Sequence, residues 1–198
     1  MKGILFKPDM IEAIVEGRKT VSRRIAKTKK PLRFVMGKLQ VWNQETFEGG
    51  SWWDLMPKYQ IGDVVYIKEA WHYLNIEENK ATPYDFGIEF ADGEILWWTD
   101  NGNEMNYPLD EKKRSPLFLK AKFARYFIKI TDARPERLQE ITLEDIYDEG
   151  IDVVPSYDRI DAFKRLWDSI NPKSKRDTNP WVWRYEFECS QSPMRLEV

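Results

Sequence analysis

The chain has 198 residues, of which 42% are apolar and 32% are charged, and its formal net charge is -2. This composition favours a soluble globular protein with a sizeable core, and no apolar run reaches the roughly 18 to 20 residues of a membrane-spanning helix. Cys189 is the only cysteine, which excludes an internal disulfide, and the N-terminus has no apolar region long enough for a signal peptide. We therefore expect a cytoplasmic protein without a membrane partner.

The first predicted element is a short helix. Pro8 and Asp9 are start signals, an apolar face follows over residues 10–15, and Gly17 is a stop signal. The basic stretch that comes next therefore lies just past a helix end.

Strands are predicted along most of the following chain. Residues 33–42 favour a strand and residues 45–57 a loop. The later segments expected to form strands are 64–71, 86–90, 94–98 and 117–130, the last as one long strand or a strand pair. The Asp-Gly pair at 92–93 predicts a hairpin turn between two of them.

Two helices and one strand complete the pattern. Thr142 and Asp145 have capping-box spacing at the start of a helix that ends at Gly150, and residues 158–170 repeat apolar side chains at helical spacing. Residues 181–187 alternate like a half-buried strand. We expect an α+β fold with a small β-barrel and about three flanking helices, in one elaborated domain over residues 1–190 with a flexible tail over 191–198.

Residues 17–24 carry the strongest chemical signal. They set one amine, two hydroxyls and three guanidiniums side by side, in the order Gly17, Arg18, Lys19, Thr20, Val21, Ser22, Arg23, Arg24. If the segment is extended, Lys19 and Arg23 point to one side, and Ser22 and Arg24 to the other. Such a cluster can hold a phosphate or activate a nucleophile, but a solvated basic turn that closes a helix has the same pattern.

The charge distribution supports an anionic partner. Residues 1–40 hold eleven Lys or Arg against three Asp or Glu, about +8, so the remaining 20 and 30 leave about -10 elsewhere. A basic segment on an acidic body indicates a localised anionic ligand, unless its charges pair within the fold.

Several chemistries are disfavoured by the residues present. His72 and Cys189 are the only residues of their kind, so we expect no metal site and no cofactor, and the chain has no phosphate-binding glycine loop. A lysine-assisted hydroxyl remains, in which neighbouring arginines and partial burial lower the pKa of Lys19. Glu69 and Glu149 are the candidate proton donors, although Glu149 alone is typical of a solvent-facing helix end.

Four tryptophans stand in loop or strand-end contexts. Stacking on a nucleobase is reasonable for such side chains, and core packing is their commoner use. They are Trp52, Trp53, Trp97 and Trp98.

Four motifs occur in an order that resembles the ASCH domain of the PUA-like superfamily. They are Gly17-Arg18-Lys19-Thr20 with Ser22 and Arg24, Gly62-Asp63-x-x-Tyr66-x-Lys68-Glu69-x-Trp71, Ile141-Thr142-x-Glu144-Asp145-x-x-x-Glu149-Gly150-Ile151, and Asn179-Pro180-Trp181-Val182-Trp183-x-Tyr185-Glu186-Phe187. The chain looks most like the larger ASCH proteins of phages and prophages.

The resemblance implies a small barrel around a cleft that accepts RNA, single-stranded nucleic acid or a modified nucleoside. Some small relatives are amidohydrolases that deacetylate 4-acetylcytidine, and by position their lysine, threonine and glutamate match Lys19, Ser22 and Glu149. Serine replaces threonine at the nucleophile. The residues expected to bind nucleic acid or nucleoside are Arg18, Arg23, Arg24, Lys68, Glu69, Trp71, Lys120 and Lys122.

The chain is about twice as long as those hydrolases, and the extra residues lie mostly between Arg24 and Asp63 and between Trp71 and Leu117. Such insertions can bind a longer nucleic acid or another partner. Three alternatives to hydrolysis stay open: a non-catalytic nucleic-acid binder, a phage accessory or structural protein, and a ribonuclease.

Overall fold

The computed structural model describes residues 1–43, 50–74, 86–98, 112–151 and 158–191. Two compact units emerge from the contacts along the chain. Unit 1 comprises Met1–Ile11, Val64–Ile128 and Ser190–Val198, and unit 2 comprises Glu12–Asp63 and Lys129–Cys189. The tail predicted over 191–198 lies, from residue 192 onward, outside the described residues.

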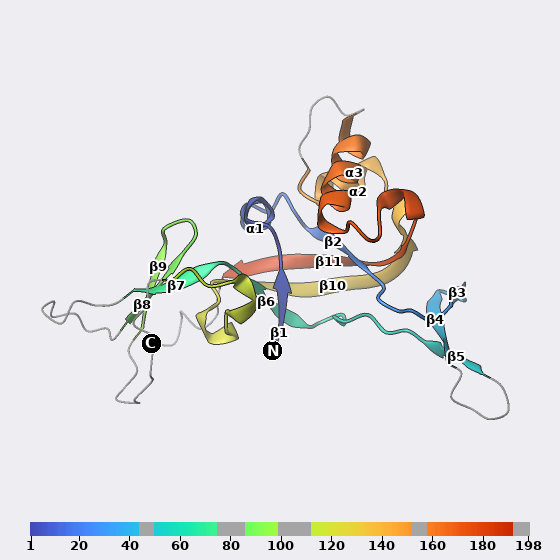
Figure 1. Ribbon diagram of the computed structural model, residues 1–198, viewed down its shortest axis with the longest axis horizontal. Coiled ribbons are helices and arrows are strands. Elements are labelled where there is room, and N and C mark those ends of the chain that lie inside the picture. Colours follow the sequence, from blue (N-terminus) through green and yellow to red (C-terminus); the bar gives the residue numbers. More distant parts are fainter. Residues whose placement is uncertain (44–49, 75–85, 99–111, 152–157, 192–198) are drawn as a thin grey trace, which may run out of the picture. The chain divides into compact units, whose positions relative to one another are not determined.

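The protein is α+β and mostly strands, with three α-helices and three sheets in the part of the chain that the structure describes (Figure 1). The largest sheet has the order β1-β6-β10-β11-β2, in which β1 pairs with β6 in parallel and β11 with β2 antiparallel. The bounds of its strands are Lys2–Leu5, Val64–Lys68, Tyr126–Arg137, Trp181–Gln191 and Val21–Ile25 in that order. The α+β class and the three helices are confirmed, whereas the described strands form open sheets and no closed barrel.

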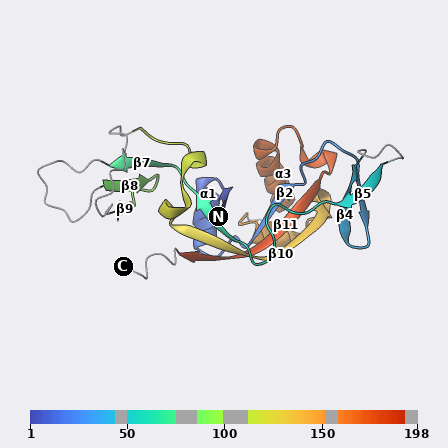
Figure 2. The ribbon, with the colours of Figure 1, turned by 90° about the horizontal axis from the view of Figure 1, so that it is seen from below.

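A second sheet, in unit 2, contains β3 (Leu32–Val35), β4 (Lys38–Asn43) and β5 (Ser51–Asp54) (Figure 2). The single strand predicted over 33–42 is wrong, because Met36 and Gly37 form a tight turn with φ of 50° and 77°. Two successive positive φ angles suit a two-residue hairpin. The loop predicted over 45–57 is also wrong at β5, where pairing with β4 supplies the order that the local sequence does not.

The third sheet, in unit 1, contains β7 (Trp71–Leu74), β8 (Phe86–Phe90) and β9 (Ile95–Trp98). Its predicted turn is confirmed, since Gly93 has a φ of 83° and its N–H donates to the Phe90 carbonyl oxygen at 3.0 Å.

The strand predicted over 117–130 begins only at Tyr126. Two 3-10 helices, η1 (Pro116–Phe118) and η2 (Ala121–Phe123), precede it. The hydroxyl of Ser115 accepts from Leu117 N, and proline at the first position of η1 favours this local turn over a strand.

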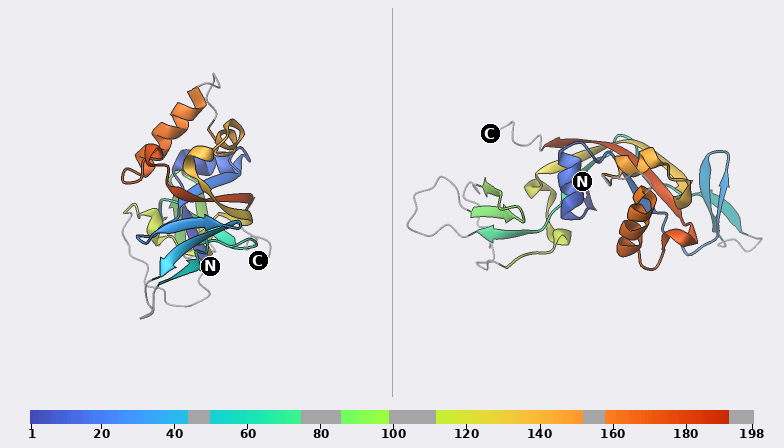
Figure 3. Two further views of the ribbon diagram at one scale, coloured as in Figure 1. Left: turned by 90° about the vertical axis from the view of Figure 1, so that its right-hand side faces the viewer. Right: turned by 90° about the horizontal axis from the view of Figure 1, so that it is seen from above.

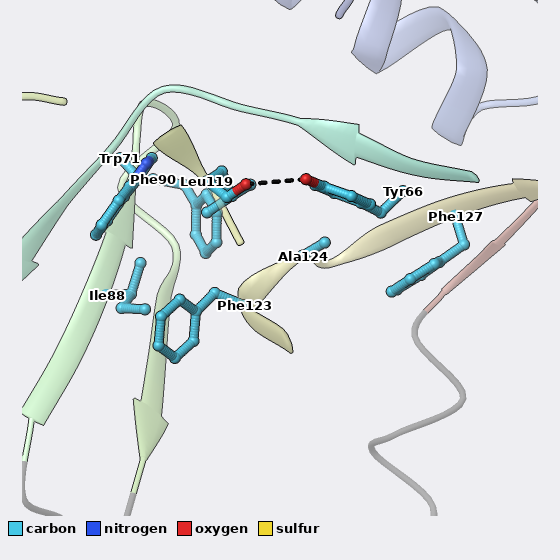
Figure 4. Close-up of a cluster of buried hydrophobic side chains, with 8 residues drawn as sticks. All are labelled: Tyr66, Trp71, Ile88, Phe90, Leu119, Phe123, Ala124 and Phe127. Carbon is cyan, nitrogen blue, oxygen red and sulfur yellow. Dashed lines mark hydrogen bonds between the residues drawn. The ribbon is translucent and has the colours of Figure 1, made fainter. Parts of the chain in front are cut away.

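The core of unit 1 is largely aromatic (Figure 4). The hydroxyl of Tyr66 donates to the Leu119 carbonyl oxygen at 3.2 Å, so its polar end is satisfied. The cluster contains Tyr66, Trp71, Ile88, Phe90, Leu119, Phe123, Ala124 and Phe127.

The helices are α1 (Pro8–Val15), α2 (Leu143–Asp148) and α3 (Arg159–Ile170), with short 3-10 turns η3 (Leu138–Glu140) and η5 (Arg176–Thr178). α2 and α3 form part of unit 2 (Figure 3). Both helices contribute side chains to an apolar cluster. Its members are Leu138, Ile141, Ile146, Ile151, Phe163, Trp167 and Val182. None of the described helices is long and apolar enough to cross a membrane.

The predicted capping box of α2 is confirmed. Asp145 N donates to Thr142 Oγ1 at 3.1 Å, and Thr142 N donates to Asp145 Oδ2 at 3.2 Å. Gly150 follows the helix with a φ of 80°. The capping box therefore fixes the start of α2, and Gly150 fixes its end, where Glu149 lies.

Candidate functional site

Two helix ends meet at Lys19 and Glu149, both in unit 2. Gly17 leaves α1 with a φ of 75°, which turns the chain so that Lys19 N donates to the Ala13 carbonyl oxygen at 2.9 Å. Residues 19 and 149 then form an isolated antiparallel bridge. The backbone therefore brings together two residues that are 130 positions apart.

The side chain of Lys19 also contacts Glu149. Lys19 is 2% exposed, and its Nζ donates to Val21 O at 2.8 Å, Glu149 O at 2.9 Å and Glu149 Oε2 at 2.5 Å. A lysine ammonium has three protons, and each has an oxygen acceptor here. The structure thus joins two of the three predicted catalytic residues through a buried ion pair.

Arg23 holds the other carboxylate oxygen. Its Nη1 donates to Glu149 Oε1 at 3.2 Å, and its Nε donates to Glu136 Oε1 at 2.6 Å. Its Nη2 forms an ion pair with Asp145 Oδ2 at 2.9 Å. Glu149 therefore lies between Lys19 and Arg23, each of which contacts one oxygen of its carboxylate.

Burial and the neighbouring charges change the ionisation of this cluster. Burial lowers the pKa of Lys19, Glu149 opposes this, and the charges of Arg24 and Arg23 lower it further. Although burial acts against ionisation of Asp145, the charge of Arg23 and further donors lower its pKa to about 2. The direction predicted for Lys19 agrees with these contacts, with burial as the main cause.

The carbonyl oxygen of Val21 accepts a hydrogen bond from Lys19 Nζ. Ser22 is the next residue, so the backbone of Ser22 lies directly beside the ammonium. Ser22 is buried in β2 opposite Tyr185 of β11. Side chains alternate along a strand, so Ser22 and Arg24 share the face opposite Val21 and Arg23.

Arg18 stands apart from the cluster. Its side chain is exposed and pairs with Glu16. It has the environment of a solvated basic turn, which was the alternative for the whole segment.

The remaining predicted residues belong to unit 1. Lys68 is half-buried and its Nζ donates to the Leu117 carbonyl oxygen at 2.7 Å, while Lys120 and Lys122 are exposed. Trp71 is 5% exposed within the aromatic core, which leaves little of its ring open to a base.

Glu69 belongs to an ion cluster that the sequence did not indicate. Arg125 is buried and pairs with Glu69, with Asp92 at 2.8 Å, and with Glu94. The guanidinium lies 4.1 Å from the centre of the Phe90 ring. Burial raises the pKa of Glu69, which the charge and hydrogen bonds of Arg125 oppose.

Local sequence patterns did not predict the partners of Arg23 or the contacts around Arg184, Tyr59 and Tyr185. Arg184 Nε donates to Asp145 Oδ1 at 3.0 Å, and the rings of Tyr59 and Tyr185 lie 5.4 Å apart. The one available signal was Asp145, which appeared only as a capping residue. Over the described ranges, no group of three or more His, Cys, Asp or Glu is arranged to hold a metal ion.

Of the four tryptophans considered for stacking, Trp53 and Trp97 are exposed and Trp52 is half-buried. The side chain of Trp98 lies outside the described part of the chain.

Comparison of the chain with protein-family models, curated proteins and solved structures gives no match.

Proposed function

We propose that this chain is an ASCH-like protein of the PUA-like class that binds RNA or a modified nucleoside at the part of unit 2 around Lys19, Arg23 and Glu149. The observation that carries the proposal is the buried contact of Lys19 Nζ with Glu149 Oε2. Lys19 comes from the first motif of the resemblance and Glu149 from the third. Their contact supports the proposal that the two motifs contribute residues to one site.

The cluster suits recognition of a polar heterocycle. Lys19 and Arg23 each donate to one carboxylate oxygen of Glu149 and fix its position, and each of these oxygens has a lone pair for a second hydrogen bond. A preorganised acceptor of this kind can bind the amine edge of a base such as cytosine. Arg24, half-buried on the same strand as Arg23, adds a cation for a phosphate.

A second candidate function is hydrolysis of an N-acyl nucleoside such as 4-acetylcytidine. Neutral Lys19 would accept the proton of Ser22, the Oγ would attack the acyl carbon, and protonated Glu149 would give its proton to the departing amine. Because strand alternation places Ser22 on the face opposite Arg23, this reaction requires the Ser22 side chain to turn toward Lys19. Water would then release the acyl group from Ser22. The lowered pKa of Lys19 favours this reaction, whereas its contact with Glu149 favours the charged lysine.

We therefore rank nucleic-acid or nucleoside binding first among the candidate functions, and hydrolysis of a bound N-acyl nucleoside is the most specific version of it. Ribonuclease activity and a phage accessory role remain predictions from the resemblance.

Calorimetric titration with cytidine and 4-acetylcytidine tests the binding proposal. Glu149→Gln keeps the size of the side chain but removes its charge, and we expect at least about a tenfold loss of affinity from one charge-assisted hydrogen bond. Glu144→Gln, on the exposed face of α2, is the matched control and should bind as the unaltered protein does. Equal affinity of all three proteins would count against the site.

Amine release from 4-acetylcytidine tests the hydrolytic form. The unaltered protein should release cytidine and Ser22→Ala should not, while both should bind the nucleoside. Full turnover by Ser22→Ala would exclude the serine as the nucleophile.

A further inference from the structure

The sheet formed by β3, β4 and β5 has two chemically different faces. We call one of them the outer face, and the register of the strands defines it. Arg33 is opposite Gln40, Gln40 is opposite Asp54, and Trp42 is opposite Trp52. Register partners point to the same side of a sheet, so the outer face consists of Arg33, Val35, Lys38, Gln40, Trp42, Trp52 and Asp54.

The other face is covered by the rest of unit 2 only in part, since Phe34 and Trp53, which belong to it, are exposed. Leu39 is 1% exposed, and the ring of Phe34 lies 5.4 Å from that of Trp181. On the outer face, Arg33, Val35, Lys38 and Asp54 are exposed, and Gln40, Trp42 and Trp52 are half-buried. The outer face is therefore a solvated surface that carries two indole rings.

The aromatic and basic side chains of the outer face contact one another. The guanidinium of Arg33 lies 4.3 Å from the centre of the Trp52 ring, and the rings of Trp42 and Trp52 meet edge to face at 5.3 Å. Arg33 Nε donates to Gln40 Oε1 at 3.0 Å. A planar guanidinium held on an indole is a surface on which a nucleobase can stack.

Polar groups surround the stack. Gln40 Nε2 donates to Asp54 Oδ1 at 2.9 Å, and Lys38 Nζ donates to Asp54 Oδ2 at 2.8 Å. These amide and carboxylate groups can exchange hydrogen bonds with base edges, and Lys38 can contact a phosphate.

The charge of the surrounding sequence favours a polyanion. Residues 21–43 contain seven Lys or Arg and no Asp or Glu. The exposed ones are Lys27, Lys29, Lys30, Arg33 and Lys38, because Arg23 is buried against Glu136, Asp145 and Glu149 and Arg24 is half-buried. Cations interleaved with aromatic rings are the combination that binds single strands without strict sequence preference.

We propose that the outer face binds single-stranded nucleic acid, with bases stacked on the Arg33–Trp52 pair and phosphates held by Lys38. The ligand class rests on the proposed function, but the surface is separate from the Lys19–Glu149 pair. The proposal gives a function to the first of the two insertions, the one between Arg24 and Asp63.

Fluorescence anisotropy tests the proposal on the full chain. The probe is a labelled oligouridylate of about twelve nucleotides, a length within the range that one single-strand-binding domain covers. We expect Trp52→Ala to weaken binding at least about tenfold, because one stacked base is lost. Trp53→Ala is the matched control, since Trp53 is the next residue, is 59% exposed and belongs to the opposite face. Its affinity should stay within about twofold of that of the unaltered protein.

Trp52→Ala could disturb the small sheet, so the exposed pair Arg33→Ala and Lys38→Ala provides a second variant. Loss of two cations should weaken binding and reduce the slope of log affinity against log salt by about 1 to 2. Unchanged affinity in this double variant, or equal losses in Trp52→Ala and Trp53→Ala, would overturn the proposal.

Glu149→Gln separates this proposal from the proposed function. If that variant loses nucleoside binding but holds the oligonucleotide, both surfaces are supported. If no protein binds cytidine but the Arg33 and Lys38 variant still loses the oligonucleotide, the outer face is supported alone. If Glu149→Gln loses the oligonucleotide and the Arg33 and Lys38 variant does not, the outer face is excluded.

Discussion

Lys19 and Glu149 form a buried ion pair across 130 positions of sequence, and Arg23 binds the second oxygen of the same carboxylate. Removing one partner of a buried pair leaves an uncompensated charge. Lys19→Met should therefore lower the free energy of unfolding by about 3 kcal/mol, measured by urea denaturation. Lys164→Met breaks an exposed pair with Asp177 and should cost at most about 1 kcal/mol.

The double variant Lys19→Met and Glu149→Leu provides a further check. It removes both charges, so its stability should exceed that expected from adding the two single losses. Strict additivity would show that the two groups do not interact.

Gly150 should tolerate no side chain. It has a φ of 80°, and an added Cβ would lie 3.0 Å from Lys19 Cβ and 3.1 Å from Ala13 Cβ. We expect Gly150→Ala to lower the thermal midpoint and destabilise the fold by about 2 kcal/mol, from backbone strain and crowding together. Gly17→Ala is the control for strain alone, because Gly17 has a φ of 75° and no atom near its added Cβ, so it should cost less.

The stability should depend on pH through Asp145. The pKa of this carboxyl is about 2 in the folded protein, against a usual value of 3.8. The unfolded chain therefore binds more protons between these values, so the stabilisation is complete above about pH 4 and is lost as the pH falls toward 2. Its size is about 1 kcal/mol once solvent screening is discounted.

Urea denaturation measures this effect. Asp145→Asn and the unaltered protein are compared at pH 7 and at the lowest pH at which both proteins are folded. The difference in stability should shrink at acid pH. A constant difference would mean that the carboxyl is not held ionised by Arg23 and Arg184.

Unit 1 should depend on the ion cluster around Arg125. Arg125→Met leaves Glu69 buried at 6% exposure without its main cation, and we expect a loss of about 3 kcal/mol in denaturation experiments. Adding Glu69→Gln should restore part of the loss, because the buried charge is gone. No recovery would indicate that Arg125 acts through packing on Phe90 alone.

Local rules predicted the parts of the fold that depend on neighbours in sequence. The Thr142–Asp145 capping box and the turn at Gly93 follow from residues within four positions. The hairpin at Met36-Gly37 was missed because methionine rarely adopts a positive φ, so the pair carries no turn signal. The 3-10 turns at 116–123 were missed because their apolar alternation also fits a strand.

The candidate site was less predictable because its contacts are not local. Residue pattern alone left Glu149 as an exposed helix end, and only the family resemblance connected it with Lys19. The partners of Arg23 are Glu136 and Asp145, both more than a hundred positions away. No spacing rule links residues so far apart, which is also why the cluster around Arg125 went unnoticed.

The most direct measurement is nitrogen NMR of the lysine side chains during titration with cytidine and 4-acetylcytidine. A buried ammonium with three acceptors exchanges its protons slowly, so the Lys19 signal should be resolved and should disappear in Lys19→Met. The account predicts that nucleoside shifts this signal to saturation while exposed lysines such as Lys164 do not move. A Lys19 signal that stays unchanged at nucleoside concentrations up to the limit of solubility would contradict it.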